Sequence, residues 1–212
     1  MRCAAFLISK AGRIEADFRD APNEAPRTEH RTASIGALLF SVSFLESSIN
    51  ELFTDAKEGE DHSTAGLDGS VIKRLSRAWP LRLGLLEKYK MALVLADAEP
   101  FAIGRAPYDD ARVLIQVRNT LVHYAPESIP GDPYIRGQED LHRLAKALRP
   151  RISVCPFYAE GNSFWPDRAL GHGCAEWALR SSLAFTDTFF AKLGKTPPYE
   201  DLKPELPHAW FE

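Results

Sequence analysis

The sequence predicts an all-α protein, an antiparallel helical bundle of four to five main helices with irregular N- and C-terminal arms. Apolar residues recur at three- and four-residue spacing over several long segments, and segments rich in proline and glycine separate them. No run of alternating polar and apolar residues indicates a sheet. Hydrophobic residues make up 45% of the chain and charged residues 26%, which is typical of a globular protein.

The first third of the chain predicts one long helix after an irregular arm. Residues 1–27 are mixed in polarity and contain Pro22 and Pro26, so we expect an irregular N-terminal arm there. From Thr28 to about Lys57 the spacing predicts one long amphipathic helix. Its apolar face consists of Ile35, Leu38, Leu39, Val42, Leu45, Ile49, Leu52 and Phe53. The polar, glycine-containing residues 58–70 predict a loop.

The middle of the chain predicts three further helices. A short helix over residues 71–79 stops at Pro80, which can open the next helix. That helix carries the apolar residues Leu85, Leu86, Tyr89, Leu93 and Ala96. The third helix begins around Asp109 and Asp110, whose carboxylates suit the positive end of a helix dipole, and finishes before Pro126. Its apolar stripe consists of Val113, Leu114, Val117, Leu121 and Tyr124.

The last third predicts two helices and a proline-rich tail. Residues 125–136 are irregular, helix character returns over 138–148, and residues 152–155 are extended before an aromatic loop. A strong helix covers about 173–192, and four prolines make the tail non-helical. The expected organisation is an N-terminal arm over 1–27, a helical bundle over 28–194 and a proline-rich tail over 195–212.

The net charge and the cysteine content limit which partners and which cellular environment we expect. The formal charge of −3 provides no global field for nucleic acid, so RNA contact would depend on local basic clusters. One such cluster, which is more often a solvated helix face, consists of Lys73, Arg74, Arg77 and Arg82. Cys3, Cys155 and Cys174 are an odd, widely spaced set that favours neither a disulfide framework nor a metal site. We expect a cytoplasmic protein without a membrane span and without a bound metal.

Residues 118–123 are the most informative segment of the chain. Arg118, Asn119 and His123 place a cation, an amide and a titratable imidazole near one helix C-terminus, which favours the protonated imidazolium. Asn119 and His123 share a helix face, whereas Arg118 lies about 7.5 Å along the axis and roughly 140° round from His123. Either the arginine side chain wraps round, the helix unwinds near Tyr124, or a second copy of the chain supplies the missing group. The last option predicts a homodimer.

Two segments together resemble the HEPN superfamily, a group of all-α nucleotide-binding domains. Residues 113–124 read VLIQVRNTLVHY, which is similar to the family signature of arginine, a polar residue and a histidine a few positions later. Residues 41–53 read SVSFLESSINELF, which is similar to an early long helix in several branches of the family. The resemblance covers about residues 28–193. It implies a dimeric, metal-independent endoribonuclease of toxin or antiviral systems, which needs no cofactor.

The resemblance also implies roles for individual residues. Arg118 would hold the scissile phosphate, His123 would move a proton, and Asn119 would position the phosphate or the histidine, giving a 2′,3′-cyclic phosphate. Glu46, Asn50 and Tyr124 are expected to support these groups, although contacts between buried helices are the commoner role for Glu46 and Asn50.

Partners implied by the resemblance are a second copy of the chain, RNA and a cognate antitoxin protein. Two alternatives remain beside the ribonuclease. One is a catalytically inactive HEPN-like module that binds a nucleotide, RNA or a protein, because some branches of the family have lost activity. The other is a purely structural helical protein.

Overall fold

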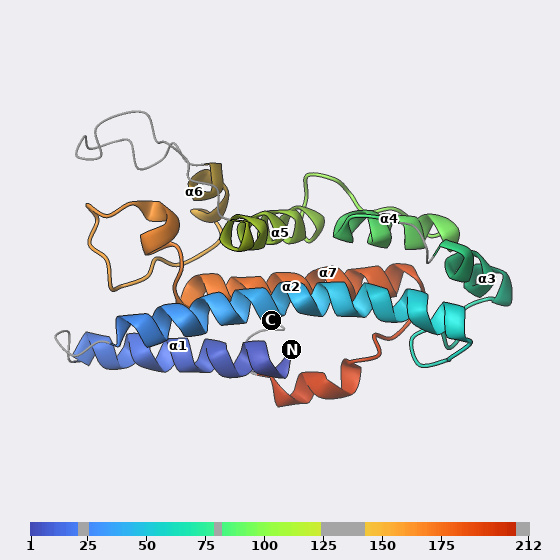
Figure 1. Cartoon of the computed structure of the whole chain (residues 1–212), viewed down its shortest axis with the longest axis horizontal. Helices are drawn as coiled ribbons and strands as arrows, with labels where there is room; N and C mark the ends of the chain where they lie inside the picture. Colours follow the sequence, from blue (N-terminus) through green and yellow to red (C-terminus); the bar gives the residue numbers. More distant parts are fainter. Residues whose placement is uncertain (21–25, 79–81, 124–142, 207–212) are drawn as a thin grey trace. The chain divides into compact units, whose positions relative to one another are not determined.

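The protein is an all-α helical bundle, as the sequence predicts (Figure 1). The computed structural model describes residues 1–20, 26–78, 82–123 and 143–206, with the side chains of Arg19 and Asp20 excepted. Within these ranges there are nine helices and no strand. In chain order they are α1 (Arg2–Asp20), α2 (Arg27–Glu58), α3 (Gly69–Ala78), α4 (Leu85–Leu95), α5 (Tyr108–Val122), α6 (Arg143–Leu148), the π-helical turn η2 (Phe164–Arg168), α7 (His172–Lys192) and the 3-10 helix η3 (Glu200–Glu205).

The chain divides into two compact units, each built from two separate stretches of sequence. Unit 1 comprises Met1–Val42 with Val113–Arg180, and unit 2 comprises Ser43–Arg112 with Ser181–Glu212. Helices α2, α5 and α7 each continue from one unit into the other. The expected boundaries of a separate domain over 28–194 stay a prediction.

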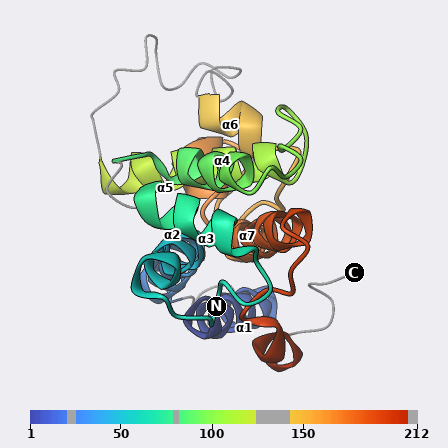
Figure 2. The same cartoon turned by 90° about the vertical axis from the view of Figure 1, so that its right-hand side faces the viewer.

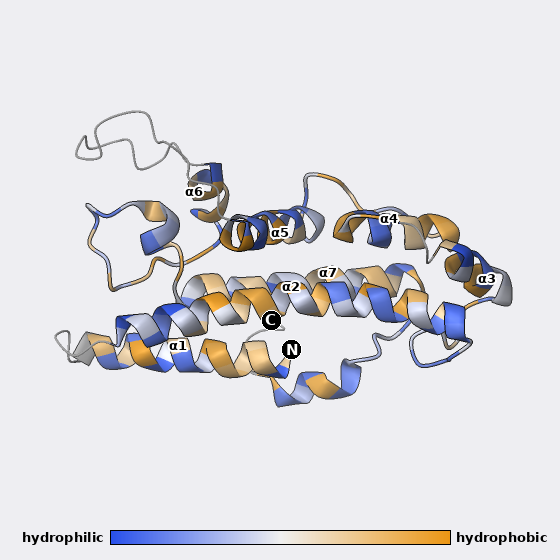
Figure 3. Cartoon of the chain, in the orientation of Figure 1, coloured by the Kyte–Doolittle hydropathy of each residue, from blue (hydrophilic) through white to orange (hydrophobic). Residues whose placement is uncertain are grey.

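Helix α1 in unit 1 is a clear departure from the expected fold. The prediction of an irregular arm over residues 1–27 is wrong for Arg2–Asp20, which form the 19-residue helix α1. Its buried apolar face alternates small and large residues, namely Ala4, Ile8, Ala11 and Ile14. Apolar and polar residues interleave along α1 and α2 (Figure 3). This face is covered by more than one element, because Leu7 packs at Gly36 of α2 and Ile14 packs with Cys155 and Phe157.

Helix α1 lies antiparallel to the first part of α2, at close range. Glu15 pairs with His30, while Leu7 near the start of α1 packs at Gly36 further along α2. A Cβ at Gly36 would lie only 2.9 Å from Leu7 Cδ1, so the glycine permits this approach. The two helices can therefore bury alanine-sized side chains between them without leaving a gap.

Unit 2 has an aromatic core. The Tyr89 ring meets the rings of Phe185 and Phe189 edge to face, with centroids 4.8 and 4.7 Å apart, and Phe101 stacks on Phe185 at 4.6 Å. The Tyr89 hydroxyl is buried and donates a 2.7 Å hydrogen bond to the Leu45 carbonyl. Burial raises the pKa of Tyr89 well above its ordinary value, so the phenol stays neutral and the polar group costs little.

Within unit 2, the C-terminal segment packs on the other helices through Tyr199. Its hydroxyl donates to Asp187 at 2.8 Å, and its ring meets Phe44 edge to face at 4.9 Å. The prediction of a non-helical tail over 195–212 is wrong for Glu200–Glu205, which form the 3-10 helix η3 with Pro204 inside it. Residues 207–212 lie outside the described ranges.

Most helix bounds agree with the predicted ones, but Pro80 does not open α4, which begins at Leu85 after the non-helical residues 82–84. Helix α2 ends at Glu58, where Gly59 adopts a left-handed backbone with φ 79° and Glu60 N–H returns to the Asp55 carbonyl at 3.0 Å. Helix α3 starts slightly earlier than expected and contacts α4 (Figure 2). Of the helix expected over 138–148, the described part is α6; residues 138–142 lie outside the described ranges.

Helix α2 is, among the described residues, the one helix long and apolar enough to cross a membrane by length and composition. Half of its most apolar 18-residue stretch is buried inside the structure. Core helices of soluble proteins pass the same test, so this feature is weak evidence for a membrane span.

Two adjacent positions on α4 test the core of unit 2. Leu93 is 1% exposed and Val94 is 66% exposed. Leu93→Ala should lower the free energy of unfolding by about 2–5 kcal/mol because it leaves a cavity. Val94→Ala, its control on the same helix, should change it by less than about 0.5 kcal/mol. Urea denaturation followed by circular dichroism measures both, and equal effects would show that α4 does not pack as described.

Candidate functional site

The end of α5 holds the residues that the sequence singles out. Asp109 and Asp110 lie in the first turn, as predicted, and the helix ends at Val122. His123 is the first residue beyond it, and its backbone N–H donates to the Asn119 carbonyl at 2.8 Å. Helical geometry therefore extends to His123, so Asn119 and His123 lie one turn apart on the same side of the helix.

Exposure differs among the three predicted site residues. Asn119 and His123 are exposed, whereas Arg118 is half-buried. The buried stripe on the opposite side of the helix includes Val113, Leu114 and Val117. Asn119 and His123 thus lie on the same side of a solvent-facing helix end. The backbone of Arg118 lies at the edge of that side. Tyr124, expected to support the site, lies outside the described residues.

Glu46 and Asn50, the other expected supporting residues, belong to unit 2. Glu46 is exposed. The Asn50 side-chain oxygen accepts a 2.7 Å hydrogen bond from Lys88 Nζ, which joins α2 to α4. Asn50 therefore forms a polar contact between packed helices, which is the commoner role expected from the sequence for this residue.

The expected basic cluster on α3 and the segment after it is partly neutralised. Lys73, Arg77 and Arg82 are exposed. Arg74 instead forms an ion pair with Asp97 at 2.9 Å. The positive charge offered to a polyanion by this part of unit 2 is therefore smaller than the sequence suggests.

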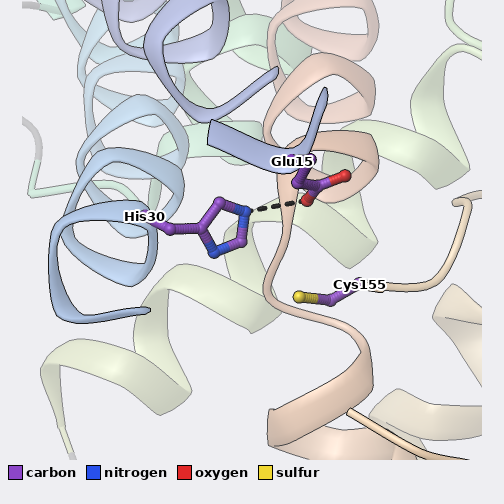
Figure 4. A group of neighbouring side chains, drawn as sticks. All are labelled: Glu15, His30 and Cys155. Atoms are coloured by element: carbon purple, nitrogen blue, oxygen red, sulfur yellow. Dashed lines mark hydrogen bonds and ion pairs between the residues drawn. The ribbon is translucent and has the colours of Figure 1, made fainter. Parts of the chain in front are cut away.

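A second constellation, Glu15, His30 and Cys155, lies in unit 1 and was not predicted. The three side chains come from α1, α2 and the segment before η2 (Figure 4). They are 7%, 1% and 1% exposed, respectively. Each offers one ligand-type atom, and these atoms all lie within 4.8 Å of one another. We call this group the buried triad.

The carboxylate of Glu15 organises the buried triad. Its Oε1 accepts a 2.8 Å hydrogen bond from His30 Nε2 and a second 2.8 Å bond from the backbone N–H of His172. The His30 ring also meets Phe157 edge to face, with centroids 4.5 Å apart. A buried carboxylate therefore has two donors but sits in largely apolar surroundings.

Burial also sets the state of the cysteines. Loss of solvent raises the pKa of Cys155 to about 11, and the nearby Glu15 carboxylate adds to this effect. Burial raises the pKa of Cys174 to about 12. Both side chains are thiols near neutral pH, which argues against a nucleophilic cysteine in the buried triad without a metal or another activating group.

The backbone at Gly171 lies directly against two members of the buried triad, Cys155 and Glu15. A Cβ at this position would lie 2.8 Å from both Cys155 Cβ and Glu15 Oε1. Real side chains do not approach that closely, so only glycine allows this backbone to pass. The sequence offers no signal that joins Glu15 and His30 to a cysteine so distant in the chain.

A third group, Glu51, Asp55 and His62, has a structural explanation in unit 2. Asp55 Oδ2 accepts hydrogen bonds from the Ser63 N–H at 2.8 Å and from the Ser63 hydroxyl at 2.6 Å. Glu51 pairs with His62 at 2.9 Å, and both side chains are largely exposed. These contacts tie the loop after α2 back onto the helix.

Comparisons with known proteins add no family to this description: no family model matches the chain, and neither curated proteins nor solved structures give a match.

The close approach at Gly171 gives a direct test of the buried triad. Gly171→Ala should lower the free energy of unfolding by about 1–3 kcal/mol, because the new methyl group overpacks against Cys155 and Glu15. Gly161→Ala in the same unit has nothing within 4 Å of its added Cβ and serves as the control. Urea melts compare the two, and equal stability of both variants would contradict the close packing.

Proposed function

We propose that this protein is a metal-independent endoribonuclease of the HEPN type, cytoplasmic and related in role to toxins or antiviral defence proteins. The observation that carries the proposal is the end of α5, where exposed Asn119 and His123 lie one turn apart and Arg118 begins on the flank of the same helix end. The all-α fold agrees with the resemblance of residues 41–53 and 113–124 to that superfamily.

These groups suit cleavage that uses the ribose 2′-OH. As the 2′-oxygen attacks the adjacent phosphorus, it loses its proton, the bond to the 5′-oxygen breaks, and that oxygen gains a proton. His123 transfers one of these protons, since imidazole titrates near neutral pH. Arg118 stabilises the extra negative charge on the phosphoryl oxygens through its fixed fork of donors. Asn119 orients the phosphate or the imidazole. The products are a 2′,3′-cyclic phosphate and a 5′-hydroxyl.

A homodimer solves the geometric problem of the site. Arg118 and His123 start roughly 140° apart round the helix, so one rigid helix aims them in different directions. In a two-fold dimer, Arg118 of one protomer and His123 of its partner can meet the same phosphate. Arg118 is half-buried, which fits a side chain whose direction is fixed by packing.

An inactive HEPN-like module that binds RNA, a nucleotide or an antitoxin-like protein is the second candidate. The formal charge of −3 and the pairing of Arg74 with Asp97 favour the forms of this module that bind a nucleotide or a protein, because they weaken attraction to a long polyanion. Such a module would use Arg118 and Asn119 for binding and would leave RNA intact.

Removal of His123 separates these candidates. Wild-type protein should cleave mixed-sequence RNA in EDTA at about pH 6 to 8, and His123→Ala should lower the rate by about 10²–10⁴-fold. His62→Ala, which changes an exposed histidine of unit 2, should leave the rate unchanged. Gel electrophoresis gives the rates, mass spectrometry identifies the cyclic phosphate, and circular dichroism checks the fold in EDTA. Intact RNA with wild-type protein, or cleavage unaffected by His123→Ala, would favour the binding module.

Mixing two inactive variants tests the shared site. Arg118→Ala and His123→Ala should each be inactive alone. After unfolding and refolding together, they should recover about a quarter of wild-type activity, because half of the dimers are mixed and each has one complete site. A mixture as inactive as its components, with analytical ultracentrifugation showing mixed dimers, would place both groups in one chain. A monomer at micromolar concentration would exclude the shared site.

A further inference from the structure

We propose that the buried triad of Glu15, His30 and Cys155 is a structural zinc site that fastens α1 and α2 to the segment before η2. This site is separate from the proposed chemistry at the end of α5 and does not depend on it. Carboxylate oxygen, imidazole nitrogen and thiolate sulfur are the three kinds of ligand atom that Zn²⁺ uses in proteins. Mixed ligands of this kind suit Zn²⁺ better than Mg²⁺ or Ca²⁺, which prefer oxygen alone.

The side chains converge from three elements that are far apart in sequence. Figure 4 shows the Cys155 sulfur pointing toward the His30 ring, with the Glu15 carboxylate next to both. The ligand-type atoms lie within 4.8 Å of one another, and His30 Nε2 is 2.8 Å from Glu15 Oε1. Ligand atoms round a tetrahedral zinc lie about 3.3–3.7 Å apart. The histidine and carboxylate would separate slightly and the sulfur would move inward, which small side-chain rotations can supply.

Charge balance favours a divalent cation at this place. The only ion-pair partner that the described structure gives the buried Glu15 carboxylate is His30, which has to be protonated to carry a charge. Zn²⁺ bound to one carboxylate, one thiolate and one neutral imidazole is electrically neutral, which removes the cost of a buried net charge. On binding, the Cys155 S–H bond breaks, a Zn–S bond forms, and the proton leaves to solvent.

The surroundings already resemble the outer shell of a metal site. The His172 N–H holds Glu15 Oε1 at 2.8 Å, and the Cys155 N–H donates to the Arg168 carbonyl at 2.7 Å, so both ligands are oriented by backbone. Ile14 and Phe157 form an apolar cluster with Cys155. The second carboxylate oxygen of Glu15 or one water would complete four-coordination.

The experiment uses the full chain, stripped of metal and titrated with zinc chloride against a chromophoric chelator. We expect one equivalent of zinc to bind and the Tm to rise by about 5–10 °C when free zinc is about a hundredfold above Kd. Cobalt(II) in place of zinc should give a near-ultraviolet band from thiolate-to-metal charge transfer. X-ray absorption of the zinc form should show one sulfur at about 2.3 Å with nitrogen or oxygen at about 2.0–2.2 Å.

Variants assign the ligands. Cys155→Ser should abolish the cobalt band and weaken zinc binding by at least about 100-fold, and Glu15→Gln should weaken it while still accepting the His172 N–H. Cys174→Ser, a matched buried cysteine of the same unit, and Cys3→Ser, an exposed one, should keep both the band and the affinity.

Several outcomes would overturn the zinc site. They are no zinc uptake by wild-type protein at micromolar free metal, a cobalt band that persists in Cys155→Ser, or loss of the band in Cys174→Ser or Cys3→Ser. If Cys155→Ser does not fold, the absorption spectrum of the wild-type zinc form decides alone, since no sulfur or more than one sulfur round the metal contradicts the site.

Discussion

The unbroken helix α2 is the constraint on which both units depend. Over its 32 residues it contributes buried side chains to each, and an insertion or deletion would rotate every later position off that face. Ala33, Ala37, Leu38 and Val42 pack in unit 1, and Leu45, Ile49, Leu52 and Phe53 pack in unit 2. Three buried serines interrupt this face: Ser41 and Ser48 donate to the Ala37 and Phe44 carbonyls of the same helix, whereas the Ser34 hydroxyl has no hydrogen-bond partner among the described residues.

Packing against α2 helps to stabilise α1, whose buried apolar face includes two alanines. Small side chains give little transfer free energy individually, but they allow two helices to approach closely and gain dispersion contacts over their whole length. Gly36 allows that approach at Leu7, and the Glu15–His30 pair fixes the register of the two helices near the other end of α1. A buried ion pair is weak evidence for added stability, yet it does specify which alignment is allowed.

Unit 1 thus contains two chemically distinct places. At the end of α5, Asn119 and His123 are solvent-facing, which the proposed contact with a large RNA substrate requires. The buried triad is closed to solvent, which suits a permanent structural ion and does not suit turnover. A chain that cleaves RNA without a metal and holds zinc for its fold would separate the two tasks in this way.

Helix periodicity and end signals were sufficient to predict the all-α class, the bounds of α2, α5 and α7, and the position of His123 at a helix end. Each of these depends on residues within a few turns of one another, and local spacing is visible in a sequence. Helix α1 was missed although Ala4, Ile8, Ala11 and Ile14 follow helical spacing, because Pro22 and Pro26 led to the prediction that the whole arm is irregular, and η3 was missed because its proline argued against any helix.

The sequence by itself determined which residue types could do chemistry at 118–123, but tertiary structure decided their exposure and assigned Asn50 to a contact with Lys88. Tertiary structure alone also brought Glu15, His30 and Cys155 together. The physical reason is that helix formation follows from short-range backbone and side-chain contacts, whereas a buried cluster depends on which faces pack together, and packing joins residues regardless of their separation along the chain.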